Sequence, residues 1–316
     1  MKVLKKIVFC LDNEIEAEFG EKVNSTCEYL KEEGIQAVII YPSKEDISKE
    51  TLLLKLFENS EEENLNDILF LTDSDLIAEC LVYSGAYVVG IQHEGNGSEN
   101  FPGLKYVFAE IDQVDVDSFI KAYQRYAKLP WDVLETERCL IRETTVEDVD
   151  TFYELYAHPE MTKYMEGLFE NPEDEKRYTR DYIEKVYGLM GFGVWTVIQK
   201  ETGKIIGRAG YSARNGFDDI ELGFLIGMNY QRQGYAYEVC KAILTYGKEI
   251  LLFPRVITFV KAENVASIKL CEKLGFTVSE TVDIEENIYG TEYHDGERVS
   301  RDKAQFGKYI KMVIEF

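Results

Sequence analysis

Hydrophobic residues in the first 130 positions gather in short runs that alternate with longer segments of mixed polarity. Short apolar runs bounded by turn residues indicate strands, and an apolar residue every three or four positions indicates a helix. The pattern predicts strands at 6–11, 36–41, 67–71, 87–91 and 106–110, and helices at 21–33, 45–57, 75–83 and 115–128. This alternation predicts a mostly parallel sheet covered by helices.

A different pattern lies near residue 220, where a strand leads through a glycine turn into a helix that ends near Leu251. The even-numbered positions from 220 to 226 are all apolar, which predicts a face that packs on a core. The odd-numbered positions place Glu221 beside Gly223 and Gly227. A face with so few side chains suits an extended, thin ligand, although a bulge or a close strand crossing would explain the same glycines.

The turn after this strand has the composition of a phosphate-binding loop. It reads Gln231-Arg232-Gln233-Gly234-Tyr235-Ala236. Gly234 can adopt backbone angles that other residues avoid, so a ligand can approach the main chain closely. The start of the following helix carries unpaired NH groups, which bind phosphate oxygens well. The turn therefore predicts a pyrophosphate site, although many glycine turns that open a helix bind nothing.

A further helix is predicted from Asn264, a capping residue, to Gly275, a helix terminator. In order, the strand with Glu221, the Q-x-x-G-x-A turn and the segment N-x-x-S-x-x-x-x-E-K-L-G-F resemble the GNAT superfamily of acetyl-CoA-dependent N-acetyltransferases. The strand I-E-L-G-F and Ser267 are most similar to its RimJ/RimL-like branch. The resemblance covers residues 137–316 and implies a mixed α+β sheet domain.

The resemblance implies acetyl-CoA as the co-substrate and indicates which residues hold it. The pantetheine arm would pair with the backbone of one strand segment, the turn would bind the pyrophosphate, and the later helix would touch the cofactor. These cofactor residues are Phe224, Leu225, Ile226, Gln231, Arg232, Gln233, Gly234, Tyr235, Ala236, Asn264 and Ser267.

The resemblance also implies direct attack of a primary amine on the thioester, with Glu221 as the general base. Free amines have a pKa near ~10, so a base is useful at neutral pH even if it acts through water. A solvated carboxylate or a substrate-orienting group would explain Glu221 as well. Many relatives place a general-acid tyrosine where this chain has Cys271. Either another hydroxyl serves as the acid or none is needed, because a thiolate leaves readily.

The acceptor is expected where helices at 146–157 and 174–188 and their connection meet the sheet. Tyr164, Met165 and Glu166 lie in that connection and are the candidates for an amine-binding site. Packing of Tyr164 and Met165 in a core would explain those two residues equally well. The C-terminal strand at 308–316 is expected to close the same side.

Composition restricts the partners further. A formal net charge of -23 argues against nucleic acid, which is bound by clustered Lys and Arg, and favours a cationic small-molecule or peptide amine. Solubility alone would also explain this charge. Six scattered cysteines and three histidines predict neither a disulfide framework nor a metal site. No signal peptide or apolar span is found, so we expect a cytoplasmic protein without a membrane partner.

The length of 316 residues predicts two domains, which we place at 1–130 and 137–316. The front domain is expected to be Rossmann-like or HAD-like. Its opening strand with Asp12, and the later segment Leu71-Thr72-Asp73-Ser74, resemble worn versions of the haloacid dehalogenase (HAD) phosphatase motifs. The nucleophile position of that family holds Cys10 here, and a thiol ligates Mg²⁺ poorly. The resemblance therefore implies a front domain without catalysis.

The predicted function is an N-acetyltransferase of α/β fold. Two alternatives remain at this point. A sensor that binds acyl-CoA without transfer is left open by Cys271, and a HAD-type phosphatase with a regulatory GNAT domain conflicts with Cys10.

Overall fold

The computed structural model describes residues 3–12, 16–49, 51–52 and 64–316. The chain divides into two compact units, Met1–Leu129 and Pro130–Phe316, and each is described by itself. The predicted helix at 45–57 lies partly outside the described residues; of its described part, 45–49 is not helical, and Leu52 is.

The front unit contains a five-stranded sheet in the order β2-β1-β3-β4-β5, and every pair in it is parallel. The strands are β1 (Lys6–Cys10), β2 (Gln36–Ile40), β3 (Ile68–Thr72), β4 (Tyr87–Ile91) and β5 (Val107–Phe108). The helices are α1 (Ala17–Glu32), α3 (Asp75–Tyr83) and α4 (Val116–Ala127), with 3-10 turns at Leu65–Asp67, Glu94–Asn96 and Ile111–Gln113. The predicted parallel sheet is confirmed.

The strand order of the front unit is that of flavodoxin-type doubly wound sheets, whereas a Rossmann sheet runs 3-2-1-4-5. Both faces of β1 are buried: Ile7 and Phe9 belong to the core under α1 and α4, and Val8 and Cys10 to the core under α3. Membership of the HAD family stays a prediction.

The back unit contains a mixed eight-stranded sheet in the order β12-β13-β11-β10-β9-β8-β7-β6. Its strands are β6 (Asp132–Glu135), β7 (Cys139–Arg142), β8 (Val194–Gln199), β9 (Ile205–Ala213), β10 (Ile220–Ile226), β11 (Arg255–Val260), β12 (Thr277–Glu286) and β13 (Gln305–Glu315). Only the β10–β11 pair among these neighbours is parallel. The predicted mixed sheet and C-terminal strand are confirmed.

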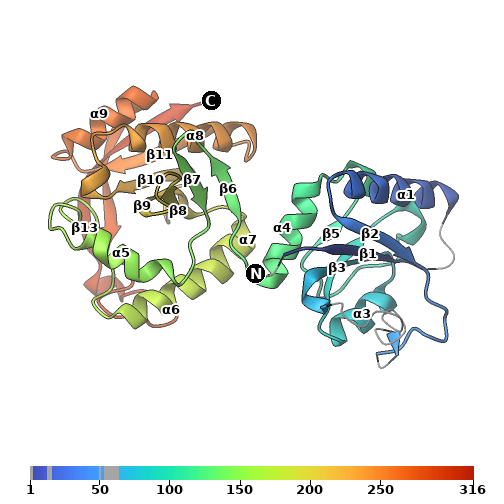
Figure 1. The fold of residues 1–316 in the computed structure, drawn as a ribbon. Coiled ribbons are helices and arrows are strands. Elements are labelled where there is room, and N and C mark those ends of the chain that lie inside the picture. Colours follow the sequence, from blue (N-terminus) through green and yellow to red (C-terminus); the bar gives the residue numbers. More distant parts are fainter. Residues whose placement is uncertain (1–2, 13–15, 50, 53–63) are drawn as a thin grey trace. The chain divides into compact units, whose positions relative to one another are not determined.

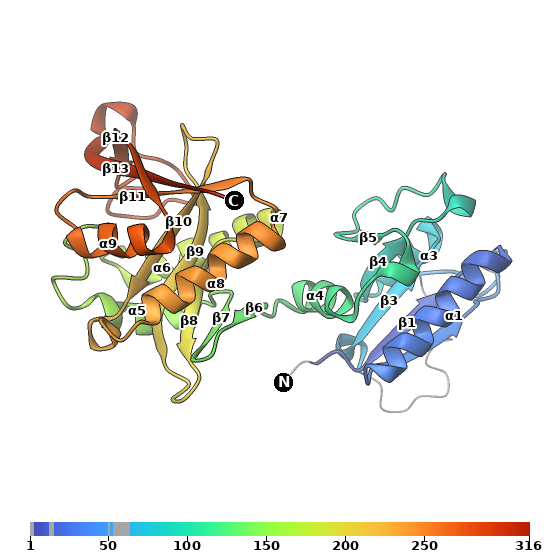
Figure 2. The same ribbon diagram turned by 90° about the horizontal axis from the view of Figure 1, so that it is seen from above.

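Helices cover both faces of this sheet, with α8 and α9 on one side and α5 and α6 on the other (Figures 1 and 2). They are α5 (Asp148–Tyr156), α6 (Pro172–Tyr182), α7 (Gly188–Met190), α8 (Tyr235–Glu249) and α9 (Val265–Leu274). A π-helical turn at Ile183–Tyr187 joins α6 to α7, and 3-10 turns lie at Met228–Tyr230 and Arg301–Lys303.

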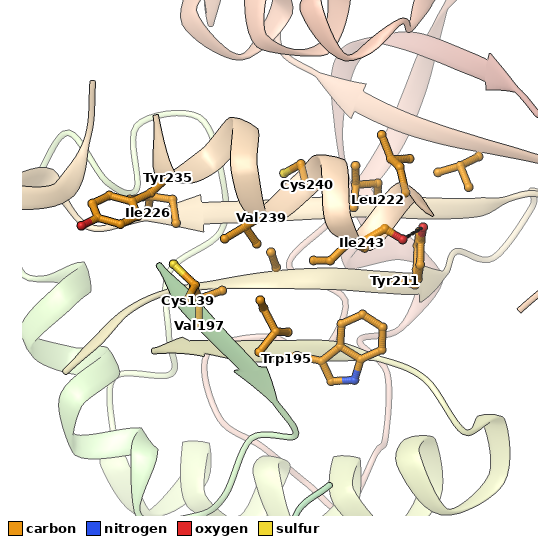
Figure 3. Packing of buried hydrophobic residues seen from close by; sticks show 14 of the residues in the cluster. Cys139, Trp195, Val197, Tyr211, Leu222, Ile226, Tyr235, Val239, Cys240 and Ile243 are labelled. Carbon is orange, nitrogen blue, oxygen red and sulfur yellow. Dashed lines mark hydrogen bonds between the residues drawn. The ribbon is translucent and has the colours of Figure 1, made fainter. Parts of the chain in front are cut away.

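The even-numbered face of β10 packs against α8, as its apolar pattern predicts. Leu222 and Ile226 share one core with Val239 and Ile243 of α8 (Figure 3). Tyr211 of β9 donates its hydroxyl to the carbonyl of Ile243 at 2.8 Å, which fixes α8 on the sheet. The odd-numbered face of β10 therefore lies toward α5 and α6.

The helices of the site begin and end at residues with suitable chemistry. Asn264 accepts a hydrogen bond from the NH of Ser267 at 3.2 Å, and Gly275 adopts a left-handed φ of 102°, so the predicted limits of α9 are confirmed. Gly234 precedes α8 with a φ of 88°, which glycine adopts without strain.

Candidate functional site

The ladder between β10 and β11 ends almost as soon as it begins. Pairing between them is formed at Ile220 and Glu221 and, within the described residues, nowhere beyond. On its other side β10 stays paired with β9 over its whole length. One edge of β10 downstream of Glu221 thus carries backbone groups that no neighbouring strand uses.

The direction of each backbone group on β10 follows from the ladder with β9. The NH of Gly227 donates to the carbonyl of Ile206 at 2.8 Å. Because NH groups point to alternate sides along a strand, the NH of Leu225 also points to β9. The NH groups of Phe224 and Ile226 point to the open edge instead. Of the three strand residues predicted to contact a ligand through the backbone, two present their NH groups to that edge.

The two glycines on the odd-numbered face, Gly223 and Gly227, differ in the space around them. A Cβ on Gly223 would meet nothing within 4 Å, so this position is open. A Cβ on Gly227 would approach a side-chain methyl of Leu155 in α5 to 2.6 Å. Gly223 therefore fits the predicted smooth surface for a ligand, whereas Gly227 allows close packing of α5.

The predicted turn is exposed and leads directly into α8. Gln231, Gln233 and Gly234 are exposed, and Arg232 is an exposed non-glycine residue with a φ of 59°. Such left-handed residues concentrate at functional sites. Gln231 Nε2 donates to the carbonyl of Ile226 at 2.9 Å, which ties the turn to the end of β10.

The turn is also held by Arg138, which the sequence did not indicate. Its Nη1 donates to the carbonyl of Gln233 at 3.1 Å, and its guanidinium lies 4.2 Å from the centre of the Tyr235 ring. Glu238 of α8 binds Arg138 at 2.6 Å. Burial alone would raise the pKa of Glu238, but hydrogen bonds with Thr136 and Arg138 outweigh it and lower that pKa.

Gly234 leaves space beside the main chain that a larger side chain at this position would fill. A Cβ on Gly234 would lie 3.4 Å from Nη2 of Arg138. A positive guanidinium, exposed backbone and a helix start thus meet at one point. These features fit the pyrophosphate of a nucleotide.

Cys271, at the position of the expected acid, is fully buried. Burial is the main reason that the pKa of its thiol rises to about 12. A buried thiol of this kind is a poor proton donor. Asn264 is used as the cap of α9, and Ser267 lies half-buried in the first turn of that helix.

Glu221 is nearly buried, with 8% of its surface exposed, and faces the α5 and α6 side. Its Oε2 accepts a hydrogen bond from Nε of Arg214 at 2.7 Å, and Ser212 Oγ lies 3.5 Å away. Arg214 in turn lies 5.7 Å from the centre of the Phe259 ring. Glu221 is thus held in place by Arg214 and is not a solvated carboxylate.

The three candidate acceptor residues differ in how closely the structure connects them to Glu221. Glu166 accepts a hydrogen bond from the NH of Asn287, and its charge helps to raise the pKa of Arg214, the partner of Glu221. Tyr164 is half-buried with Lys163 Nζ 5.3 Å from its ring centre. Met165 is 38% exposed, so the interpretation of Met165 as a core residue is wrong.

The described residues offer no second site of another kind. No group of three or more His, Cys, Asp or Glu residues in those ranges is arranged to hold a metal ion. Among the helices that the structure describes, none is both long and apolar enough to cross a bilayer. A hollow of about 500 Å³ between Asp219 and Lys311 contains none of the predicted site residues.

Comparison with known proteins gives a consistent result for the back unit. A family model described as an acetyltransferase (GNAT) domain matches residues 138–277. The uncharacterized N-acetyltransferase p20 of Bacillus licheniformis is 32% identical over 151 residues, which are 46% of this chain and 82% of that protein. The uncharacterized N-acetyltransferase YnaD of Bacillus subtilis is 31% identical over 147 residues, 45% of this chain and 81% of that protein.

Among solved structures, a GNAT-family acetyltransferase from Bacillus anthracis is 22% identical. The match covers 58% of this chain and 97% of that one, with a TM-score of 0.43.

Proposed function

Since the chain belongs to the GNAT family of acetyltransferases, we propose that its back unit moves an acetyl group from acetyl-CoA to a primary amine by direct attack. The observation that carries this proposal is the early end of the β10–β11 ladder. It leaves an edge of β10 without a strand partner immediately before a turn that exposes the start of α8. An extended amide chain that ends in a pyrophosphate matches both features.

In this proposal the open edge of β10 binds the pantetheine arm through the NH groups of Phe224 and Ile226. Leu225 contributes its side chain, because its NH points to β9. The pyrophosphate lies against the backbone of Gln231–Ala236, with Arg232 at the rim and Arg138 behind the turn. Asn264 and Ser267 at the start of α9 contact the cofactor from the other side.

Acetyl-CoA supplies an activated carbonyl and a thiolate that leaves readily; the chain must position the amine and accept its proton. We assign the acceptance of the proton to Glu221, which acts through water because its carboxylate is bound to Arg214. The deep burial of Cys271 removes it as a donor to the leaving thiolate. The amine enters from the side of α5, α6 and Glu166.

The front unit is proposed to be non-catalytic. Cys10, at the position of a phosphatase nucleophile, is fully buried, and burial raises the pKa of its thiol to about 12. Asp73 accepts a hydrogen bond from the NH of Asp12 at 2.9 Å, so this carboxylate is already engaged. Both observations support a front unit without phosphoryl transfer.

One observation favours a second candidate, a sensor that binds acyl-CoA without transfer. Glu221 is held by a guanidinium, and the thiol of Cys271, at the position of the expected acid, is buried. Release of free thiol from acetyl-CoA, measured against polyamines, amino acids and N-terminal peptides, separates the two. Thiol release with at least one amine supports transfer. Tight calorimetric binding of acetyl-CoA without release on any amine supports the sensor.

A further inference from the structure

Arg208 of β9 is a positive charge on the α5 and α6 side of the sheet, and one of its donors has no hydrogen-bond partner among the described residues. Its Nε is shielded from solvent and donates no hydrogen bond. The guanidinium lies 4.5 Å from the centre of the Phe152 ring. A ring compensates a cation only in part. The half-buried guanidinium thus keeps an Nε–H that no described group accepts and that an anion could use.

The groups that face Arg208 come from the two helices and the π-helical turn on that side. They are Phe152 and Tyr156 of α5, Glu175 and Tyr178 of α6, and Tyr187 of the turn. Glu175 is the only carboxylate of this set, and it accepts a hydrogen bond from the NH of Phe169 at 3.2 Å. Burial, partly offset by Arg208, raises the pKa of Glu175. Glu175 is therefore a weak partner for the guanidinium.

Aromatic rings continue outward from Arg208. Tyr178 stands 5.9 Å from Tyr182 and 5.7 Å from Tyr289, measured between ring centres. All three tyrosines are half-buried, so each keeps part of its ring accessible. A guanidinium beside partly exposed rings provides one charged contact and several apolar ones.

The position of Arg208 relates this set to the proposed transfer site. Arg208 is the register partner of Leu225, which lies between Phe224 and Ile226 on β10. Partners of a hydrogen-bonded antiparallel pair have Cα atoms about 5.5 Å apart. Arg208 therefore lies one strand away from the edge proposed for the pantetheine arm. Glu221, on the same face, has its charge balanced by Arg214 and does not repel an anion there.

We propose that Arg208 binds the carboxylate of the acetyl acceptor, so that the acceptor is an amine with a nearby carboxylate and an apolar body, as in an apolar amino acid. The planar guanidinium matches a carboxylate with two parallel hydrogen bonds. The inference rests on the proposed acetyl transfer and narrows its substrate class. It differs from the expectation of a purely cationic acceptor that the net charge gave.

The test compares amines that differ only in the carboxylate. Thiol release from acetyl-CoA is measured with L-phenylalanine against phenethylamine, L-leucine against 3-methylbutylamine, and spermidine as a polycation. We expect kcat/KM to be about 10- to 100-fold higher for the carboxylate member of each pair, the usual value of a charged hydrogen-bonded contact. Equal or faster reaction of phenethylamine or spermidine overturns the proposal.

A substitution assigns the preference to Arg208. Arg208→Met keeps an unbranched apolar stem and removes the guanidinium with its charge, and it should lower kcat/KM for L-phenylalanine about 10- to 100-fold without lowering that for phenethylamine. Arg180→Met on α6 removes an equal charge from an exposed position and should change neither. If Arg208→Met does not fold, Arg208→Lys is used instead, because it keeps the charge but lacks the paired NH donors of the guanidinium. It should lower kcat/KM about tenfold for L-phenylalanine and leave that for phenethylamine unchanged. An equal loss with both amines shows a structural role and refutes the assignment.

A binding measurement separates this inference from the proposed transfer. L-Phenylalanine is titrated calorimetrically into the full chain with and without CoA, and into Arg208→Met. If acetyl-CoA binds but no amine releases thiol, the proposed transfer fails, while binding of L-phenylalanine that Arg208→Met abolishes still supports the anion site. If amines are acetylated but the affinity for L-phenylalanine is the same in both proteins, the transfer stands and the anion site is rejected.

Discussion

The central parallel strand pairs of the two sheets differ in how far their pairing extends. In the front unit, β1 and β3 pair from Lys6 to Phe9, and Asp73 beyond β3 is enclosed by the NH of Asp12 and by His93, whose Nε2 lies 3.6 Å away. In the back unit, β10 and β11 separate after Glu221 and leave the rest of that edge of β10 without a strand partner. Because buried polar groups are normally paired, an edge left unpaired indicates ligand chemistry. The comparison therefore supports the proposal that the back unit holds the ligand site.

The largest expected effect is at the turn that follows the open edge. Gly234→Val places a β-branched side chain in a left-handed conformation and a Cβ 3.4 Å from Arg138 Nη2. We expect the Kd for acetyl-CoA, measured by calorimetry, to rise about 100-fold, because the NH groups at the start of α8 lose their alignment.

Gly216→Val is the matched control for that substitution. Gly216 has nearly the same φ, 89°, and a Cβ there would meet nothing within 4 Å. It should carry similar backbone strain and leave the Kd unchanged. Similar loss of affinity in both variants would mean that strain in the back unit, and not the turn, controls binding.

A smaller effect is expected at the start of the open edge. Glu221→Gln keeps the shape of the side chain and removes its negative charge. We expect turnover to fall at least about tenfold with the affinity for acetyl-CoA preserved, the usual size of a general-base effect. Unchanged turnover would remove Glu221 from the mechanism, and loss of affinity instead would make it a structural partner of Arg214.

A weaker effect is expected from the residue behind the turn. Arg138→Met removes the hydrogen bond to the Gln233 carbonyl and the charge beside Gly234, so the Kd for acetyl-CoA should rise about fivefold. Lys200→Met is the control, since Lys200 is 37% exposed against 40% for Arg138 and bonds Thr136 instead of the turn. An equal rise of the Kd in both variants would mean that loss of any positive charge weakens binding, and that Arg138 has no specific role at the turn.

Local patterns in the sequence predicted the parts of the site that depend on near neighbours. The apolar alternation of β10 fixed its core face, and Asn264 and Gly275 fixed the ends of α9. In each case the physical cause lies within a few residues, in the pleat of a strand or in a side chain that bonds its own helix.

Long-range relations could not be predicted in this way. Arg138 contacts a carbonyl 95 positions away, and nothing near it in the sequence indicates that bond. Arg208 looks like an ordinary strand residue, because the Nε–H that no described group accepts depends on α5 and α6. The front strand order likewise depends on which distant strands pair.

The smallest expected effect tests how well the front unit tolerates its enclosed carboxylate. Asp73 is buried, and burial raises its pKa above 3.8 despite the hydrogen bond from Asp12 and the attraction of His93. A carboxyl group whose pKa is raised on folding contributes stability below its unfolded pKa, and the contribution is lost as pH rises through the folded pKa. Asp73→Asn should therefore make the front unit slightly more stable than the natural chain at pH 7, with the gain absent at pH 3.

Hydrogen-exchange protection of residues 68–72 in the full chain, corrected for the intrinsic rate, measures that difference.

Asp148 of the back unit is the opposite case and serves as the control. Burial would raise the pKa of Asp148, but the two hydrogen bonds from Arg142 at 2.7 Å, with those from Thr145 and Thr196, lower it. Its stabilisation is present above the unfolded pKa and is lost as pH falls through the folded pKa. Asp148→Asn should thus destabilise the back unit at pH 7. A loss of protection in Asp73→Asn at pH 7 would show that the front unit needs this charge, and the contrast between the two sheets would not hold.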